Sequence, residues 1–256
     1  MTAVFKKEMA AYFKSLTGYV AAAGLVLISG FLFYLRTVFY AEQSMLMAGA
    51  PPGMGPSLNF NKAILASLPA SVIFLTLFFV IPIMTMRAFA EEKKTGTLEM
   101  LFTYPISESG LIAGKYLSCL IATLPGVLMT AAFPLFLLKK IPGMDLGYLV
   151  SGYTGVTLAC MAGVAIGIWA SSLSGSQIIS SIASVTIFLA LWLIGGPADL
   201  MTGTFGTVLK ALSFANNMET FTKGCIDAAS VAYFIGLTAL FLYLTYYNLA
   251  SRKWRG

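Results

Sequence analysis

The sequence contains no histidine and few charged residues. Charged side chains make up only 10% of the 256 residues, whereas 58% of the residues are hydrophobic. A soluble domain carries about 25% charged residues. So little charge cannot cover a water-facing surface, which argues against a soluble enzyme, a disordered tail or a nucleic-acid-binding domain. The composition therefore predicts an all-α integral membrane protein.

Motifs for catalysis and for metal binding are also lacking. Without histidine, the commonest proton shuttle and metal ligand is absent. The three cysteines, Cys119, Cys160 and Cys225, form no Cys-x-x-Cys pair, so no metal site or disulfide framework is predicted. The nearest match to an ATP-binding loop, Gly110–Tyr116, is one residue short and ends in tyrosine instead of Ser or Thr.

We therefore expect no catalytic residue and no enzyme activity in this chain. A membrane-embedded hydrolase is the second class considered, but it would need a base or nucleophile that the sequence does not offer.

Long apolar runs are the dominant feature of the chain. A helix needs about 20 apolar residues to cross the hydrocarbon core of a bilayer. Six runs meet this length, which predicts six transmembrane helices in a single domain, residues 1–256. The six predicted spans are Tyr19–Leu35, Ala63–Met86, Tyr116–Leu138, Tyr148–Ser171, Ile178–Gly195 and Val231–Ala250.

The N-terminal segment, residues 1–17, is too polar to span. Its apolar residues recur at three- and four-residue spacing with lysines between them. This pattern predicts an amphipathic helix in the membrane interface, with its lysines towards anionic headgroups of the lipid bilayer. A signal peptide is not expected, because no cleavage site follows the first apolar run.

Basic residues predict the orientation. With the N-terminus inside, ten lysines and arginines lie on the cytoplasmic side and six lie outside, although the pair Lys139–Lys140 runs against the bias. Both termini are therefore expected in the cytoplasm.

The fourth run contains a Gly-x-x-x-Gly pair, Gly163 and Gly167. Small residues at this spacing allow close helix contact. The contact is either packing within one subunit or a dimer interface or moving seam.

The loop at residues 87–108 holds the densest charge in the chain. Gly96 permits a sharp turn, and Thr95 or Thr97 can cap a short helix that Pro105 would stop. The apolar residues of this helix share one face, which favours either docking into a groove of another protein or lying on the membrane surface. The residues assigned to this contact are Glu91, Glu92, Gly96, Thr97, Leu98, Glu99, Leu101, Phe102 and Pro105.

The segment at residues 197–230 is too long for a simple turn. Its apolar spacing predicts a first short helix, and Asn216 with Glu219 resembles a capping box that opens a second. The pair either dips into the outer leaflet or lies in the interface as packing. The residues assigned to it are Phe205, Leu209, Leu212, Asn216, Glu219 and Phe221.

Three stretches resemble a known family. They are Glu92-x-x-x-Gly-Thr-Leu-Glu-x-Leu-x-x-x-Pro-Ile-Ser107, Met84–Lys93 with Gly114-Lys-Tyr116, and Phe221-x-x-Gly-x-Ile-Asp-x-x-Ser-Val-x-Tyr-Phe234. The first resembles the signature of ABC-2 type transporter permeases. The other two resemble the gliding-motility-associated (GldF-like) subgroup of that family.

The resemblance implies a bacterial inner-membrane exporter permease. In that family the loop after the second span is a coupling helix that sits in a groove of the ATPase, and a re-entrant hairpin before the last span forms an outer gate. The implied partners are two copies of an ABC ATPase, which bind ATP and Mg²⁺, and a second permease subunit as homodimer or heterodimer. No cofactor is expected on this chain. The subgroup also implies an auxiliary membrane protein with a large external domain.

Two roles remain open besides substrate export of unknown specificity. One is transmission of ATP-driven motion to an external protein, without transport. The other is that of a multidrug, peptide or metal-maturation exporter of the same fold. The short loop at residues 171–177 is either a second ATPase contact or a plain turn. No role is assigned to the Gly/Pro/Met-rich loop at residues 49–56.

Overall fold

The computed structural model describes residues 2–48, 65–97, 107–138, 145–200 and 203–253. Within these ranges the regular structure is helical and includes a π-helical turn at Thr76–Val80, and no residue is in a strand. In chain order the elements are α1 (Thr2–Lys14), α2 (Leu16–Ala48), α3 (Ser67–Leu75), η2 (Thr76–Val80), α4 (Ile81–Thr85), α5 (Ala90–Lys94), α7 (Glu108–Met129), α8 (Ala132–Leu138), α9 (Leu146–Leu173), α10 (Gln177–Leu193), α11 (Gly195–Leu200), α12 (Thr204–Leu212), α13 (Phe214–Thr222) and α14 (Ala228–Lys253).

Six helical stretches in the described part of the chain are long and apolar enough to cross a membrane. This confirms the all-helical, six-span prediction. The stretches are Leu16–Leu46, Ser67–Lys94, Glu108–Leu137, Leu146–Leu173, Gln177–Pro197 and Ala228–Ser251. Most exceed the predicted runs, because a helix continues into polar residues once its apolar part has left the hydrocarbon.

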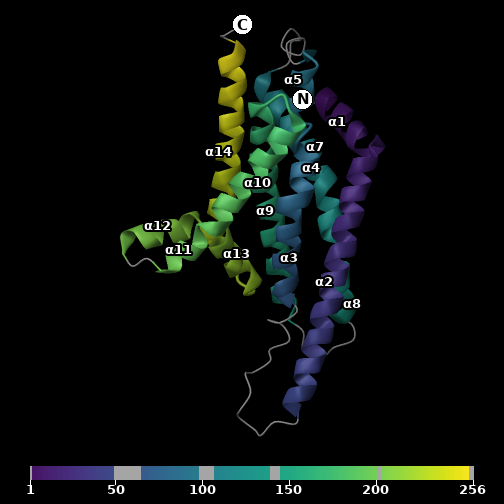
Figure 1. Cartoon of the computed structure of the whole chain (residues 1–256), viewed down its shortest axis with the longest axis vertical. Coiled ribbons are helices and arrows are strands. Elements are labelled where there is room, and N and C mark those ends of the chain that lie inside the picture. The colour runs from purple at the N-terminus through teal and green to yellow at the C-terminus, as the bar shows by residue number, and fades with distance from the viewer. Residues whose placement is uncertain (1, 49–64, 98–106, 139–144, 201–202, 254–256) are drawn as a thin grey trace.

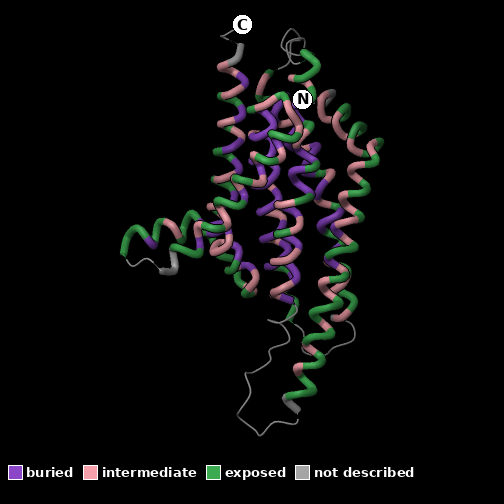
Figure 2. Tube along the Cα trace, viewed as in Figure 1, coloured by how far each residue is buried: buried purple, intermediate pink, exposed green. Residues whose placement is uncertain are grey.

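The spans form an upright bundle with both termini at one end (Figure 1). We call this the termini end; α1 and α5 lie there too. Helices α11 and α12 project sideways from the bundle, and α2 runs along its edge. Buried residues make up 72% of the most apolar stretch of α9 but only 11% of that of α2, and Figure 2 shows the buried positions gathered in the middle of the bundle.

Glycines on α9 explain its central position. A Cβ atom at Gly163 would come within 2.6 Å of Cδ1 of Ile81 and 2.7 Å of Cδ2 of Leu77. One turn further along α9, a Cβ at Gly167 would overlap the hydroxyl of Thr85. Because neither glycine has a side chain, the second span packs directly on the backbone of α9. The Gly-x-x-x-Gly pair therefore lies at a close contact between two helices of the same chain.

The second span is not a uniform α-helix. At Thr76–Val80 it forms a π-helical turn in which the amide of Ile81 donates to the carbonyl of Thr76, five residues back. Pro82 follows directly and removes a backbone donor from the same stretch. Single π-turns inside α-helices occur often at functional sites. The sequence predicted one continuous span here, since a π-turn leaves no mark in an apolar run.

We expect Gly167→Ala to destabilise the bundle. The added methyl group meets Thr85, whose hydroxyl is tied to the carbonyl of Ile81 at 2.8 Å. Overpacking of this kind costs about 1–3 kcal/mol. Thermal unfolding in detergent should show a lower Tm. In the control, Gly236→Ala on α14, the new methyl group has no neighbour within 4 Å, so an equal loss in both variants would refute the packing argument.

Candidate functional site

The densest set of polar contacts surrounds the α5 segment, residues 86–97, at the termini end. The chain leaving α4 turns at 86–89 and enters α5, where Phe89 and Ala90 are fully buried. Acidic residues occupy the first turn of α5 and basic residues its last turn, which suits the helix dipole. Gly96 has a φ of 69°, a left-handed conformation that glycine adopts without strain.

Ser171, near the end of α9, holds the turn that precedes α5. Its hydroxyl oxygen accepts from the backbone amides of Phe89 at 3.0 Å and Ala90 at 3.1 Å. The same hydroxyl donates to the carbonyl of Met86 at 3.2 Å. One buried side chain thereby satisfies three backbone groups where a helix begins, and these groups otherwise lack partners within the helix.

The neighbouring Ser172 joins three helices. Its carbonyl accepts from Nζ of Lys93 on α5. Nδ2 of Asn248 on α14 donates to the same carbonyl and to the hydroxyl of Ser172, each at 2.9 Å. The end of α9 is therefore bonded to α5 on one side and to α14 on the other.

Lys115, in the first half of α7, is the most buried charged residue near this segment. Its side chain is 2% exposed, and Nζ donates to Oε1 of Glu8 and Oε1 of Glu92 at 2.8 Å each and to the carbonyl of Ala88 at 2.7 Å. Nζ also lies 5.1 Å from the centre of the Phe89 ring. We call Glu8, Lys115 and Glu92 the ion triad; it joins α1, α7 and α5.

The ion triad satisfies the donors of Lys115, whereas Oε2 of Glu92 is buried without a hydrogen-bond partner among the described residues. An ammonium group has three N–H donors, and all three are used here. Removing an ion from water costs several kcal/mol, which is repaid only by good geometry and full hydrogen bonding. Glu8 and Glu92 are themselves 17% and 15% exposed, so their charges are screened far less than surface charges.

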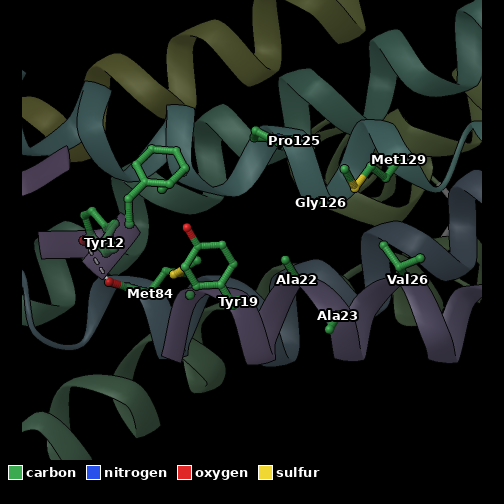
Figure 3. A pocket seen from close by; sticks show the side chains of 12 residues that line it. Tyr12, Tyr19, Ala22, Ala23, Val26, Met84, Pro125, Gly126 and Met129 are labelled. Atoms are coloured by element: carbon green, nitrogen blue, oxygen red, sulfur yellow. Dashed lines mark hydrogen bonds between the residues drawn. The ribbon is translucent and has the colours of Figure 1, made fainter. Parts of the chain in front are cut away.

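Tyr12 is a second link between α1 and the second span. Its hydroxyl donates to the carbonyl of Met84 at 3.0 Å. Burial raises the pKa of Tyr12 well above its usual value of 10.0, so the hydroxyl remains a donor. Figure 3 shows this bond at the end of an apolar cavity of about 440 Å³, which lies between the α1–α2 elbow and Pro125–Gly126 of α7.

Comparison with known families shows which family the chain belongs to. The model of a family described as ABC-2 family transporter protein matches residues 2–254. The chain belongs to the ABC-2 transporter family. No curated protein matches it.

Membership defines the chain as a multi-pass membrane component of an ABC transporter. ABC-2 permeases are transport components that are not themselves catalytic, and they work with an ABC ATPase and dimerise.

The predicted coupling residues of this ABC-2 chain fall in two groups. Glu91 is exposed on α5, Glu92 belongs to the ion triad, Gly96 follows α5, and Thr97 is exposed with its hydroxyl 2.9 Å from that of Thr95. Thr95 itself ends α5 as its C-terminal cap. The remaining predicted residues lie outside the described part of the chain: Leu98, Glu99, Leu101, Phe102 and Pro105.

The short loop between α9 and α10 lies beside α5. A Cβ atom at Gly175 would be 3.7 Å from Cβ of Lys93. The loop at residues 171–177, which the sequence leaves as either an ATPase contact or a plain turn, therefore lies next to α5.

The predicted external hairpin corresponds to α11, α12 and α13. On α12, Phe205 and Leu212 are exposed and Leu209 is half-buried. On α13, Phe221 is fully buried, its carbonyl accepts from the hydroxyl of Ser151 at 2.7 Å, and its ring lies 6.1 Å from that of Phe234. Thus α13 is packed into the bundle, whereas α12 stands away from it (Figure 1).

The predicted cap of the second short helix was wrong. Ser213, not Asn216, caps α13, because its hydroxyl accepts from the amide of Asn216 at 3.3 Å. Asn216 lies within the helix, and Glu219 forms an exposed ion pair with Lys223 at 2.9 Å. Both Ser213 and Asn216 are good caps, and the sequence did not show where the preceding helix ends.

The sequence reasoning missed Glu8, Lys115, Ser171, Ser172 and Asn248. Lys115 was counted only as a basic residue that favours the inside. Lys115 directly precedes the predicted third span, Tyr116–Leu138, so nothing in the sequence indicated its burial; the helix in fact begins at Glu108 and carries Lys115 within it.

We expect Ser171→Ala to loosen the α5 segment. Two buried amides lose their acceptor, at a cost of about 1–3 kcal/mol each. Hydrogen exchange of residues 86–92 should become faster. Ser181→Ala is the matched control, because its hydroxyl bonds only within its own helix, to Ile178; unchanged exchange in Ser171→Ala would contradict the assigned role.

Proposed function

We propose that the chain is the permease subunit of an ATP-driven exporter and that the segment at residues 87–108 docks into a partner ABC ATPase. In this proposal the termini end faces the cytoplasm, and ATP and Mg²⁺ bind in the partner. Two ATPases serve a pair of permeases, either two copies of this chain or this chain with a related one. The α12–α13 hairpin acts as an outer gate.

The observation that carries the proposal is that polar bonds link the α5 segment directly to α9 and α7, and through these two helices to α14 and α1. Ser171 and Ser172 join it to α9, Ser172 continues to Asn248 on α14, and the ion triad reaches α7 and α1. A displacement of this segment would therefore reach α9 and α7, and through them α14 and α1. A surface helix with no such role would not need buried polar bonds to so many neighbours.

The segment is also continuous with the second span. Motion of α5 passes through α4 into the π-turn at Thr76–Val80 and to Pro82, where backbone pairing is irregular. Irregular turns of this kind let a helix change register or bend. The close contact at Gly163 and Gly167 then passes such a change to α9.

Resemblance supports the gliding-motility-associated subgroup and an auxiliary protein with a large external domain. The bundle offers no charged cluster in its centre that would name a substrate among the described residues.

We predict that the double variant Leu98→Asp, Leu101→Asp loses its ATPase. Two carboxylates would replace the apolar face that the sequence predicts for the docking helix. Loss of contacts worth about 1.4 kcal/mol or more lowers affinity on the order of tenfold. The measurement is co-purification of a co-expressed partner ABC ATPase.

The matched control is Ile226→Asp. Ile226 is 59% exposed in the loop before α14, at the end of α14 opposite the termini end. This variant should retain the ATPase. If the double variant inserts into the membrane and still binds the ATPase normally, the docking assignment is wrong.

The orientation is tested by cysteine labelling. Cys225 is exposed and is expected outside, whereas Cys119 and Cys160 are buried. A membrane-impermeant maleimide should label Cys225 in spheroplasts. In a Cys225→Ser background, Glu91→Cys should be labelled in inside-out vesicles alone; the reverse pattern would place the α5 segment outside the cell and end the proposal.

A further inference from the structure

The exposed charge of α1 is entirely basic among its described side chains. Lys6, Lys7 and Lys14 are exposed. The single acidic residue of α1, Glu8, is turned inward onto Lys115. The ion triad thus removes the one negative charge that would otherwise offset the three lysines.

The position of α1 is fixed by the span that follows it. Only Ser15 separates α1 from α2, and the first membrane-spanning stretch begins at Leu16. At 1.5 Å per helical residue, Lys14 lies within about 3 Å and Lys6 within about 15 Å of this boundary along the helix. Phe13, beside Lys14, is 51% exposed. Lysines next to exposed apolar residues at a membrane boundary fit a surface of anionic lipid headgroups.

Two side chains of α1 connect it to the α5 segment and the adjoining span. Glu8 reaches Glu92 through Lys115, and Tyr12 bonds to the carbonyl of Met84. The peripheral helix α2 adds little to this connection, since so little of it is buried. Displacing α1 therefore breaks the ion triad, while docking α1 completes it.

We propose that α1 binds anionic lipid headgroups through Lys6, Lys7 and Lys14 and that the Glu8–Lys115–Glu92 triad transmits this binding to the α5 segment. Lipid binding stabilises the docked position of α1, and a ligand shifts an equilibrium towards the state that it binds better. The α5 segment is then held in its docked arrangement by membrane composition. The inference rests on the proposed function only in giving that segment its role in ATPase coupling.

Hydrogen exchange of the purified full-length chain in lipid nanodiscs tests the proposal. Discs of phosphatidylcholine are compared with discs that contain increasing fractions of phosphatidylglycerol. In the wild type, exchange of residues 87–96 should slow on the order of fivefold with phosphatidylglycerol, because each lysine near the surface adds to lipid attraction. High salt should reduce the effect.

Glu8→Ala separates lipid binding from its transmission. It leaves Lys115 bonded to Glu92 and Ala88 and removes the ion pair that links α1 to the triad, while the Tyr12–Met84 bond remains. In this variant α1 should still respond to phosphatidylglycerol, but residues 87–96 should not. Glu42→Ala, at an exposed position on the far part of α2, is the matched control and should behave as wild type.

The lysines are tested as a set. Lys6→Gln, Lys7→Gln, Lys14→Gln should abolish the response of both segments, and the corresponding triple change to arginine should retain it. A wild-type α5 segment that ignores phosphatidylglycerol, or a Glu8→Ala chain whose α5 segment still responds, would overturn the inference. Neither result depends on an ATPase, so loss of the lipid response with normal ATPase co-purification rejects this inference alone.

Discussion

One ammonium group constrains the termini end of this molecule. Lys115 is almost fully buried, and its three donors are taken by Glu8, Glu92 and the carbonyl of Ala88. Breaking a buried ion pair by removing one partner costs about 3–5 kcal/mol, because the other charge stays buried. Segments that are far apart in the sequence are therefore held in one relative position while the triad is intact, and the remaining bonds of the α5 segment are built around that position.

The middle and the termini end of the bundle are held by different forces. In the middle, α9 contacts the second span through glycines, and close packing leaves little room for movement. At the termini end, the α5 segment is held by hydrogen bonds and ion pairs to α7 and α9, and α7 is in turn paired with α1. Bonds of this kind can be exchanged for others in discrete steps, whereas packed apolar surfaces resist it. A displacement of α5 would thus first rearrange the polar bonds at the termini end and then move the closely packed helices in the middle of the bundle.

The sequence predicted what depends on long local patterns and missed what depends on distant pairs. Six apolar runs specify six spans, because the bilayer requires about 20 apolar residues for each. The pairs Lys115–Glu8 and Ala90–Ser171 join residues 107 and 81 positions apart, and no rule of sequence spacing predicts such pairs. The π-turn could not be predicted from the sequence either, since its residues are as apolar as their neighbours. Ser213 caps α13 in place of Asn216 because α12 ends at Leu212, which leaves Ser213 at the first non-helical position.

Membrane and nucleotide would act on the same element if both proposals hold. Coupling between two binding sites is reciprocal. If lipid binding by α1 raises the docking constant of the α5 segment by some factor, docking of that segment raises the affinity of α1 for lipid by the same factor. An ATPase that pulls the segment away from α7 must then weaken the hold of α1 on the anionic leaflet by the same factor. The α1–α2 elbow beside its apolar cavity would release and reseat once in each cycle. Release of α1 in such a cycle would have to break the bonds of Glu8 and Tyr12 and also the packing of α1 against α7.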